Sequence, residues 1–201
     1  MTTDLTRILS AAENLIDELD DTHHIAILEN YRRHAMLEYC GRFEEILAPE
    51  MTVEHPVYRM NTPQGGHVVY DGMDAVRGFY ASLKDAGLTV ATKSHEHIVV
   101  ADWGFSQENM AHQHLTGHAA RAKGHDVDDL DAYYIEDRWS SMYFLYAPDA
   151  RLIGEHVYHS VPVGFRKATD EERITLEDVV AALEPVIAAG PYRKLNLQAS
   201  L

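Results

Sequence analysis

The sequence has little of three things on which other classes of protein depend: cysteine, basic charge and long apolar runs. Its single cysteine, Cys40, excludes an intramolecular disulfide and a cysteine-ligated zinc site. Lysine and arginine number 17 against 32 aspartate and glutamate residues, for a formal net charge of −15. Nucleic acid and anionic membranes are therefore not expected partners. No apolar run approaches the roughly 18 residues that span a bilayer.

Several recognisable signals are also missing. The N-terminal stretch MTTDLTRILSAAENLIDELDD has acids among its apolar residues and lacks the basic start and apolar centre of a signal peptide. We therefore expect a cytoplasmic location. The sequence has no Walker or Rossmann fingerprint and no G-x-S-x-G nucleophile elbow. With 201 residues, 46% of them hydrophobic and 24% charged, the chain is typical of one globular domain with a sizeable core.

The apolar periodicity places helices and strands in separate blocks. Period 3.6 predicts helices over 4–20, over 22–48 with an interruption near Gly41, over 71–87, and in the tail after residue 170. Period two predicts strands over 51–60, 89–101, 107–120, 133–147 and 151–162, with a loop over 61–67. This order predicts an α+β fold. A curved antiparallel sheet wrapped around the helices would form a cone with a central pocket.

Three stretches resemble segments of the NTF2-like superfamily, in particular its SnoaL-like and scytalone dehydratase-like members. They are EYCGRFEEILAPEMTVEHPVY, DGMDAVRGFYASL and SHEHIVVADWGFSQENMAHQHLTGH. The resemblance covers roughly residues 22–162. It implies an NTF2-like domain over 22–165, preceded by a helical extension over 1–21. A C-terminal helix and tail over 166–201 would cover the pocket. It also implies a homo-oligomer, a dimer or a trimer, and a small-molecule ligand.

Histidines are dense in two of the predicted strands. Alternate strand residues share a face, so His112, His114 and His118 lie on one side of one strand. His95 and His97 share a face of the strand before it. The resemblance implies that one histidine from each of these strands faces the pocket, and His97 and His118 match those positions. We expect these two to be the catalytic acid–base pair, because histidine exchanges protons near neutral pH.

The resemblance also implies a tyrosine and an acid on the preceding helix. The position one turn before Phe43 is Tyr39, with Glu38 and Cys40 beside it. The expected acid is therefore absent or has moved to Glu38. We expect Tyr39 to be a catalytic hydroxyl donor. A tyrosine hydroxyl can protonate a leaving oxygen or hold a developing enolate.

A wider set of residues is expected to contact the substrate. In the fourth strand Trp139 and Ser141 share a face that we expect to be concave, and His159 has the matching orientation in the fifth. A single β-bulge would invert such assignments. The predicted substrate-binding residues are Tyr31, His55, His114, Trp139, Ser141 and His159.

These observations favour a cofactor-independent lyase over an isomerase. It would be a dehydratase or a retro-aldol-type carbon–carbon lyase that uses histidine and tyrosine on a hydroxylated aromatic or polycyclic small molecule. One alternative is a non-catalytic binding protein with the same cone. Another is a histidine-ligated metalloenzyme, since two His-x-His pairs on paired strands can surround one ion. Against a metal site, Glu96 lies on the opposite strand face from His95 and His97.

Overall fold

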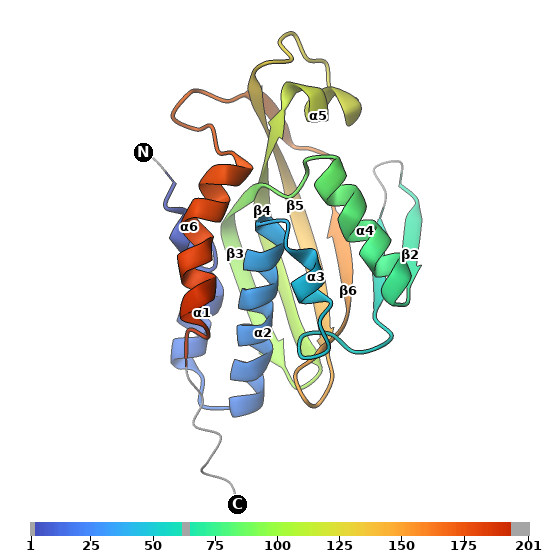
Figure 1. The fold of residues 1–201 in the computed structure, drawn as a ribbon, viewed down its shortest axis with the longest axis vertical. Coiled ribbons are helices and arrows are strands. Elements are labelled where there is room, and N and C mark those ends of the chain that lie inside the picture. The colour runs from blue at the N-terminus through green and yellow to red at the C-terminus, as the bar shows by residue number, and fades with distance from the viewer. Residues whose placement is uncertain (1–2, 62–64, 194–201) are drawn as a thin grey trace, which may run out of the picture.

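A curved, unclosed sheet with helices packed against one of its faces forms the body of the protein (Figure 1). The computed structural model describes residues 3–61 and 65–193. Within them the strand order is β2-β1-β6-β5-β4-β3, with β7 pairing with β5. The strands are β1 Val57–Asn61, β2 His67–Asp71, β3 Ala91–Ala101, β4 Gly104–Thr116, β5 Tyr133–Tyr146, β6 Leu152–His159 and β7 Gly164–Lys167. The α+β prediction is confirmed.

The helices lie before, between and after the strands along the chain. They are η1 Leu5–Arg7, α1 Ser10–Glu18, α2 Thr22–Tyr39, α3 Phe43–Ile46, α4 Met73–Asp85, α5 Gly117–Ala122 and α6 Leu176–Ala189. Asp21 caps α2 by accepting hydrogen bonds from the backbone N–H groups of His23 and His24, and Gly41 at φ +67° follows its end. None of the described helices is both long enough and apolar enough to cross a membrane.

The strands β3 to β6 form an antiparallel meander with an inner face and an outer face. The inner face packs against α2, where the Tyr31 ring lies 4.6 Å from Phe105 and 5.5 Å from Phe144. Phe105 and Phe144 are direct partners in the β4–β5 register, so residues of the same strand parity line this face. The outer face points away from the helices.

A β-bulge in β3 decides which residues reach which face. The register with β4 shifts between Ser94 and His97, and His95 has a positive φ of 52°. The extra residue reverses the alternation along the strand. As a result Lys93 and Glu96 both point inward toward Tyr31, whereas His97 is exposed on the outer face.

The segment after α6 is fastened to the beginning of the chain. The Arg193 guanidinium donates to the backbone carbonyls of Ile16 and Leu19 at 3.0 and 2.6 Å. The Glu29 carboxylate accepts from the backbone N–H groups of Tyr192 and Arg193. Together with contacts between α6 and α2, these bonds hold the segment against the junction of α1 and α2.

The structure also corrects element boundaries. The first strand begins only at Val57, and β2 and β7 were not predicted. The predicted strand over 107–120 ends at Thr116, whose hydroxyl caps the short helix α5. Residues 62–64 of the predicted loop over 61–67 and residues 194–201 of the tail lie outside the described residues. The division into domains stays a prediction.

The close approach of β6 to β1 gives a test of the packing. A Cβ on Gly154 would overlap the backbone carbonyl oxygen of Val57. We expect Gly154→Ala to lower the free energy of unfolding by roughly 1–3 kcal/mol, measured by urea denaturation. Gly78→Ala on α4, where a Cβ meets no atom within 4 Å, is the control and should be neutral or stabilising. Equal stability of both variants would contradict this packing.

Candidate functional site

Polar side chains occupy much of the inner face of the sheet, where an apolar core is usual. The strand register sets them in two rows, Asn109–Ser140–His159 in one and Gln113–Glu136 in another, with Ala111–Arg138 between them. Asn109, Ser140 and Glu136 are almost fully buried. Buried polar groups cost free energy unless they are paired, so such a surface points to a binding or catalytic role.

Five residues from α2, α4, β1 and β6 form one buried group, called here the α2–β6 cluster. The His34 Nε2 atom lies 2.9 Å from the Tyr80 hydroxyl and 3.3 Å from Glu155 Oε1. The Tyr80 hydroxyl also donates to Glu155 at 3.0 Å and lies 3.1 Å from the Tyr58 hydroxyl. Glu38 completes the cluster, with Oε2 at 3.5 Å from His34 Nε2. Its side chain is 32% exposed, whereas that of His34 is only 1% exposed.

The cluster is arranged to hold a proton near neutral pH. Burial raises the pKa of Glu155 to about 7, although the His34 charge acts in the opposite direction. Burial also disfavours the His34 imidazolium, but the carboxylates of Glu155 and Glu38 outweigh this effect and raise the pKa of His34. Near neutral pH the pair can therefore take up or release a proton without a large change in free energy.

A second group, the lysine cluster, joins α2 to the bulge of β3. The Lys93 ammonium donates to the Tyr31 hydroxyl at 2.6 Å and to Glu96 Oε1 at 3.2 Å. The Tyr31 hydroxyl lies 2.9 Å from Gln107 Oε1. Burial opposes the charge of Lys93, but Tyr31, Tyr39 and Glu96 outweigh it and raise its pKa well above the usual value. Lys93 is therefore a fixed cation beside two tyrosine hydroxyls.

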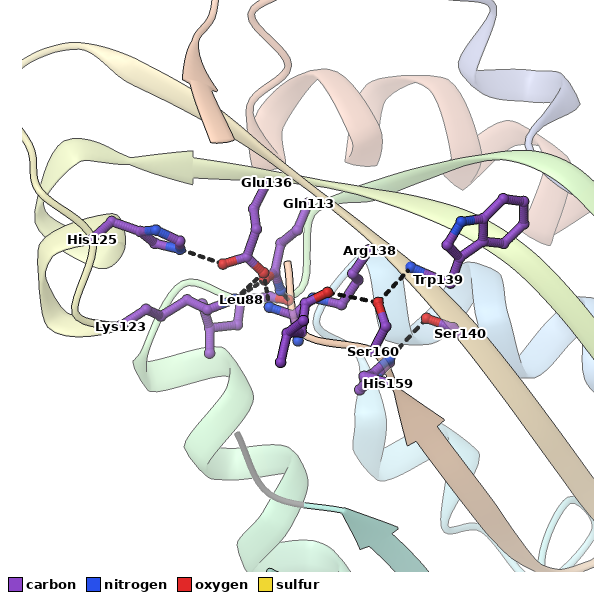
Figure 2. A network of polar contacts seen from close by, with 11 residues as sticks. Leu88, Gln113, Lys123, His125, Glu136, Arg138, Trp139, Ser140, His159 and Ser160 are labelled. Atoms are coloured by element: carbon purple, nitrogen blue, oxygen red, sulfur yellow. Dashed lines mark hydrogen bonds and ion pairs between the residues drawn. The ribbon is translucent and has the colours of Figure 1, made fainter. Parts of the chain in front are cut away.

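A third group, the rim network, lies where α5 and the loop after it meet β4 and β5 (Figure 2). Glu136 is fully buried, and Lys123 lies 2.9 Å from one of its oxygens. His125 and Arg138 pair with the same carboxylate. Burial, with the nearby Arg138 charge, lowers the pKa of Lys123 to about 7.

The rim network adjoins polar groups that have no partner. In Figure 2 the Ser140 hydroxyl meets His159 Nδ1, at a distance of 2.7 Å. Burial lowers the pKa of His159 to about 4, so its ring is neutral at physiological pH. Both amide atoms of Asn109 and the Nε of Arg138 are buried without a hydrogen-bond partner among the described residues. Such groups are the ones that a polar ligand would satisfy.

The predicted acid–base pair is not brought together. His97 pairs with Glu108 in the β3–β4 register, and both side chains are exposed on the outer face. The bulge in β3 caused this inversion. His118 is exposed on α5 and does not belong to a strand. The expectation that these two imidazoles share a hollow is therefore wrong.

Four of the expected substrate contacts are also misplaced. Trp139 and Ser141 are exposed on the outer face, because β5 turns Ser140 and Met142 inward instead. His114 lies on the outer side too, 3.2 Å from the Thr92 hydroxyl. His55 precedes β1 and is exposed, with Nε2 2.7 Å from Asp71.

Three predicted residues do reach the inner face, namely Tyr31, Tyr39 and His159. The sequence reasoning missed Lys93, Glu96, His34 and Glu155. Two of these left a readable signal. His34 and Glu38 are four apart on α2, and Glu155 has the same strand parity as His159.

A comparison with solved structures supports this fold. A protein described as a SnoaL-like polyketide cyclase from Jannaschia sp. CCS1 aligns with a TM-score of 0.53 and 11% identity, over 71% of this chain and 91% of that chain. The epoxide hydrolase/cyclase-like enzyme SalBIII, with a role in pyran ring formation in the polyether salinomycin, gives 0.47 and 16%, over 71% and 95%. A phenazine biosynthesis-related protein from Pseudomonas aeruginosa gives 0.42 and 15%, over 88% and 95%.

No family model and no curated protein matches the sequence. The structural likeness therefore concerns the fold, and it confirms the NTF2-like fold that the resemblance implied. Within residues 3–61 and 65–193, no three histidine, cysteine, aspartate or glutamate side chains are grouped as ligands for a metal ion.

The α2–β6 cluster predicts an unusual pH dependence of stability. The folded-state pKa of Glu155 is about 7 against 4.5 for a free side chain, so unfolding releases its proton between these values. The free energy of unfolding should fall as pH rises through this window, by up to about 1.4 kcal/mol per pH unit. The raised pKa of His34 acts in the same direction. Glu155→Gln should flatten this slope. The measurement is urea denaturation between about pH 5 and 8, a range that covers most of the window.

Glu172→Gln is the matched control for this experiment. Arg166 lowers the pKa of the partly exposed Glu172 to about 2, so its contribution changes only at lower pH. This variant should keep the wild-type slope between about pH 5 and 8. A wild-type protein whose stability rises across the window would contradict the assignment to Glu155.

Proposed function

We propose that the protein is a cofactor-independent acid–base enzyme, a lyase that converts a hydroxylated small molecule bound at the inner face. The observation that carries the proposal is the buried His34–Glu155 pair, which is linked through His34 to the partly exposed Glu38. A carboxylate that a ligand can touch is thereby connected to an interior group with a pKa near neutral.

Glu38 is the proposed base. It is the most exposed member of the α2–β6 cluster, and its charge acts on the rings of both His34 and His159. A molecule bound beside His159 would lie near this carboxylate. His34 and Glu155 then act as positioning residues, because they orient Glu38 and share the charge of the proton that it takes up.

Tyr39 is the proposed acid, as the sequence had suggested. Its hydroxyl is hydrogen-bonded to Lys93, whose ammonium stabilises the phenolate that forms when the proton leaves. Burial dominates and raises the pKa of Tyr39, so the hydroxyl is protonated in the resting enzyme. A protonated donor beside a fixed cation suits transfer of a proton to a leaving oxygen or to an enolate.

The same two groups support two lyase reactions. In a dehydration, Glu38 removes the proton from the carbon beside a carbonyl, the carbon–oxygen bond breaks, and Tyr39 protonates the departing hydroxide to give water. In a retro-aldol cleavage, Glu38 removes the hydroxyl proton, the carbon–carbon bond breaks, and Tyr39 protonates the enolate. Neither reaction needs an oxidant or a reductant. Proton transfer from Glu38 back to Tyr39 restores the enzyme.

The surroundings favour an aromatic or polycyclic substrate that carries carbonyl oxygens. The Phe43 and Tyr80 rings stack 6.0 Å apart, and Phe79 lies 5.3 Å from Tyr80. The unpartnered Nε of Arg138 and amide of Asn109 offer donors for carbonyl or carboxylate oxygens. These features support the substrate class that we predicted from the sequence.

The aldol adduct of benzaldehyde and acetone is a suitable probe. Dehydration gives the conjugated enone, whereas retro-aldol cleavage gives benzaldehyde and acetone, and the two are distinguished by chromatography. We expect Glu38→Gln and Tyr39→Phe to lower kcat by about 100-fold or more, because each removes a proton-transfer group. His34→Asn should shift the pH profile as well as lower kcat.

The controls are His97→Ala and His118→Ala, which remove exposed imidazoles and should keep wild-type turnover. Loss of activity in these variants, or full activity in folded Glu38→Gln, would overturn the assignment. Tight retention of hydroxylated aromatic ketones without any product would instead support a binding protein.

A further inference from the structure

Three side chains on the outer face form a continuous hydrogen-bonded line that the proposed function does not use. The Ser94 hydroxyl lies 2.8 Å from His112 Nε2, and His112 Nδ1 lies 2.6 Å from Asp137 Oδ1. The residues come from the adjacent strands β3, β4 and β5. This set is called here the outer triad.

The strand register and the bulge build this arrangement. His112 and Asp137 are direct partners in the β4–β5 register, so their side chains rise from the same face. Ser94 is the last regular residue before the bulge, and His95 follows with a positive φ that non-glycine residues rarely adopt. Backbone of this kind persists only where surrounding contacts hold it, and it is common beside active sites.

The geometry fits a serine nucleophile, its base and the group that orients the base. The carboxylate of Asp137 favours the proton on His112 Nδ1, which leaves the Nε2 lone pair facing the Ser94 hydroxyl. His112 can therefore accept the hydroxyl proton as the oxygen attacks. The His112 and Asp137 side chains are about 30% and 26% exposed, so the set is open to a ligand.

A cleft adjoins the outer triad. It has a volume of about 200 Å³, and its wall combines Thr92, His112, His114 and Ile135 with the charged residues Arg166, Glu171 and Glu172. This volume is large enough for a short acyl group with a polar end. On the other side of Ser94, His95 packs 6.2 Å from the exposed Trp139 ring, which offers an apolar surface to the rest of a small molecule.

We propose that Ser94, His112 and Asp137 form a second catalytic site, which hydrolyses small carboxylic esters. The Ser94 oxygen attacks the ester carbonyl carbon while its proton passes to His112. His112 then protonates the alcohol oxygen as the carbon–oxygen bond breaks, leaving the acyl group on Ser94. Water attacks this acyl-enzyme and gives its proton to His112, and the acid is released as the proton returns to Ser94. Only water is consumed.

A fluorophosphonate probe tests the nucleophile directly, because it reacts covalently with activated serines. We expect the full-length protein to gain one adduct, located on Ser94 by peptide mass spectrometry. Ser94→Ala should abolish this adduct, and His112→Gln should slow its formation by about 100-fold or more. Ser141→Ala removes an exposed serine of the same face and should label at the wild-type rate.

A second measurement guards against loss of folding in the variants. Ser94→Cys should react rapidly with iodoacetamide at its new thiol, and adding His112→Gln should slow that reaction, whereas the buried Cys40 contributes little. Absence of labelling in the wild-type protein, or labelling independent of His112, would overturn the proposal. Glu38→Gln should react with the fluorophosphonate at the wild-type rate. The labelling test therefore stands apart from the test of the proposed inner-face lyase.

Discussion

The register shift in β3 is the constraint on which both faces of the sheet depend. Without it, strict alternation would place Lys93 and Glu96 on opposite faces. With it, both reach Tyr31 and form the lysine cluster. Ser94, the last residue before the shift, lies on the outer face beside His112. One inserted residue therefore brings Lys93 and Glu96 together in the interior and turns His97 to the exterior.

The inner face divides into an apolar part and a polar part, and the first stabilises the fold that contains the second. Phe105, Phe144 and Tyr31 pack closely and lie near Tyr146, and they bury apolar area near the β3–β4 turn. Further along the strands, Glu136 and Asn109 are buried at a cost in free energy. Proteins commonly keep such destabilising groups where function needs them.

The sequence predicts the block order and the fold well, because periodicity and turn residues act locally. It predicts the site less well, because side-chain direction depends on pairing between distant strands. The positive φ of His95 has no signature, since histidine is not a turn residue, and so His97 was assigned to the wrong face. His118 was lost because Thr116 caps a helix within an apparently continuous strand pattern. Glu155, by contrast, could have been found from its parity with His159.

The fastening of the segment after α6 has a consequence for local dynamics. The Arg193 guanidinium donates to the backbone carbonyls at the end of α1. The Glu29 carboxylate of α2 accepts from the backbone N–H groups of Tyr192 and Arg193. Release of this segment would leave those carbonyls and that carboxylate without their partners. Opening at the end of α1 and at residues 192–193 is therefore coupled, and amide hydrogen exchange at both places would report a common opening free energy.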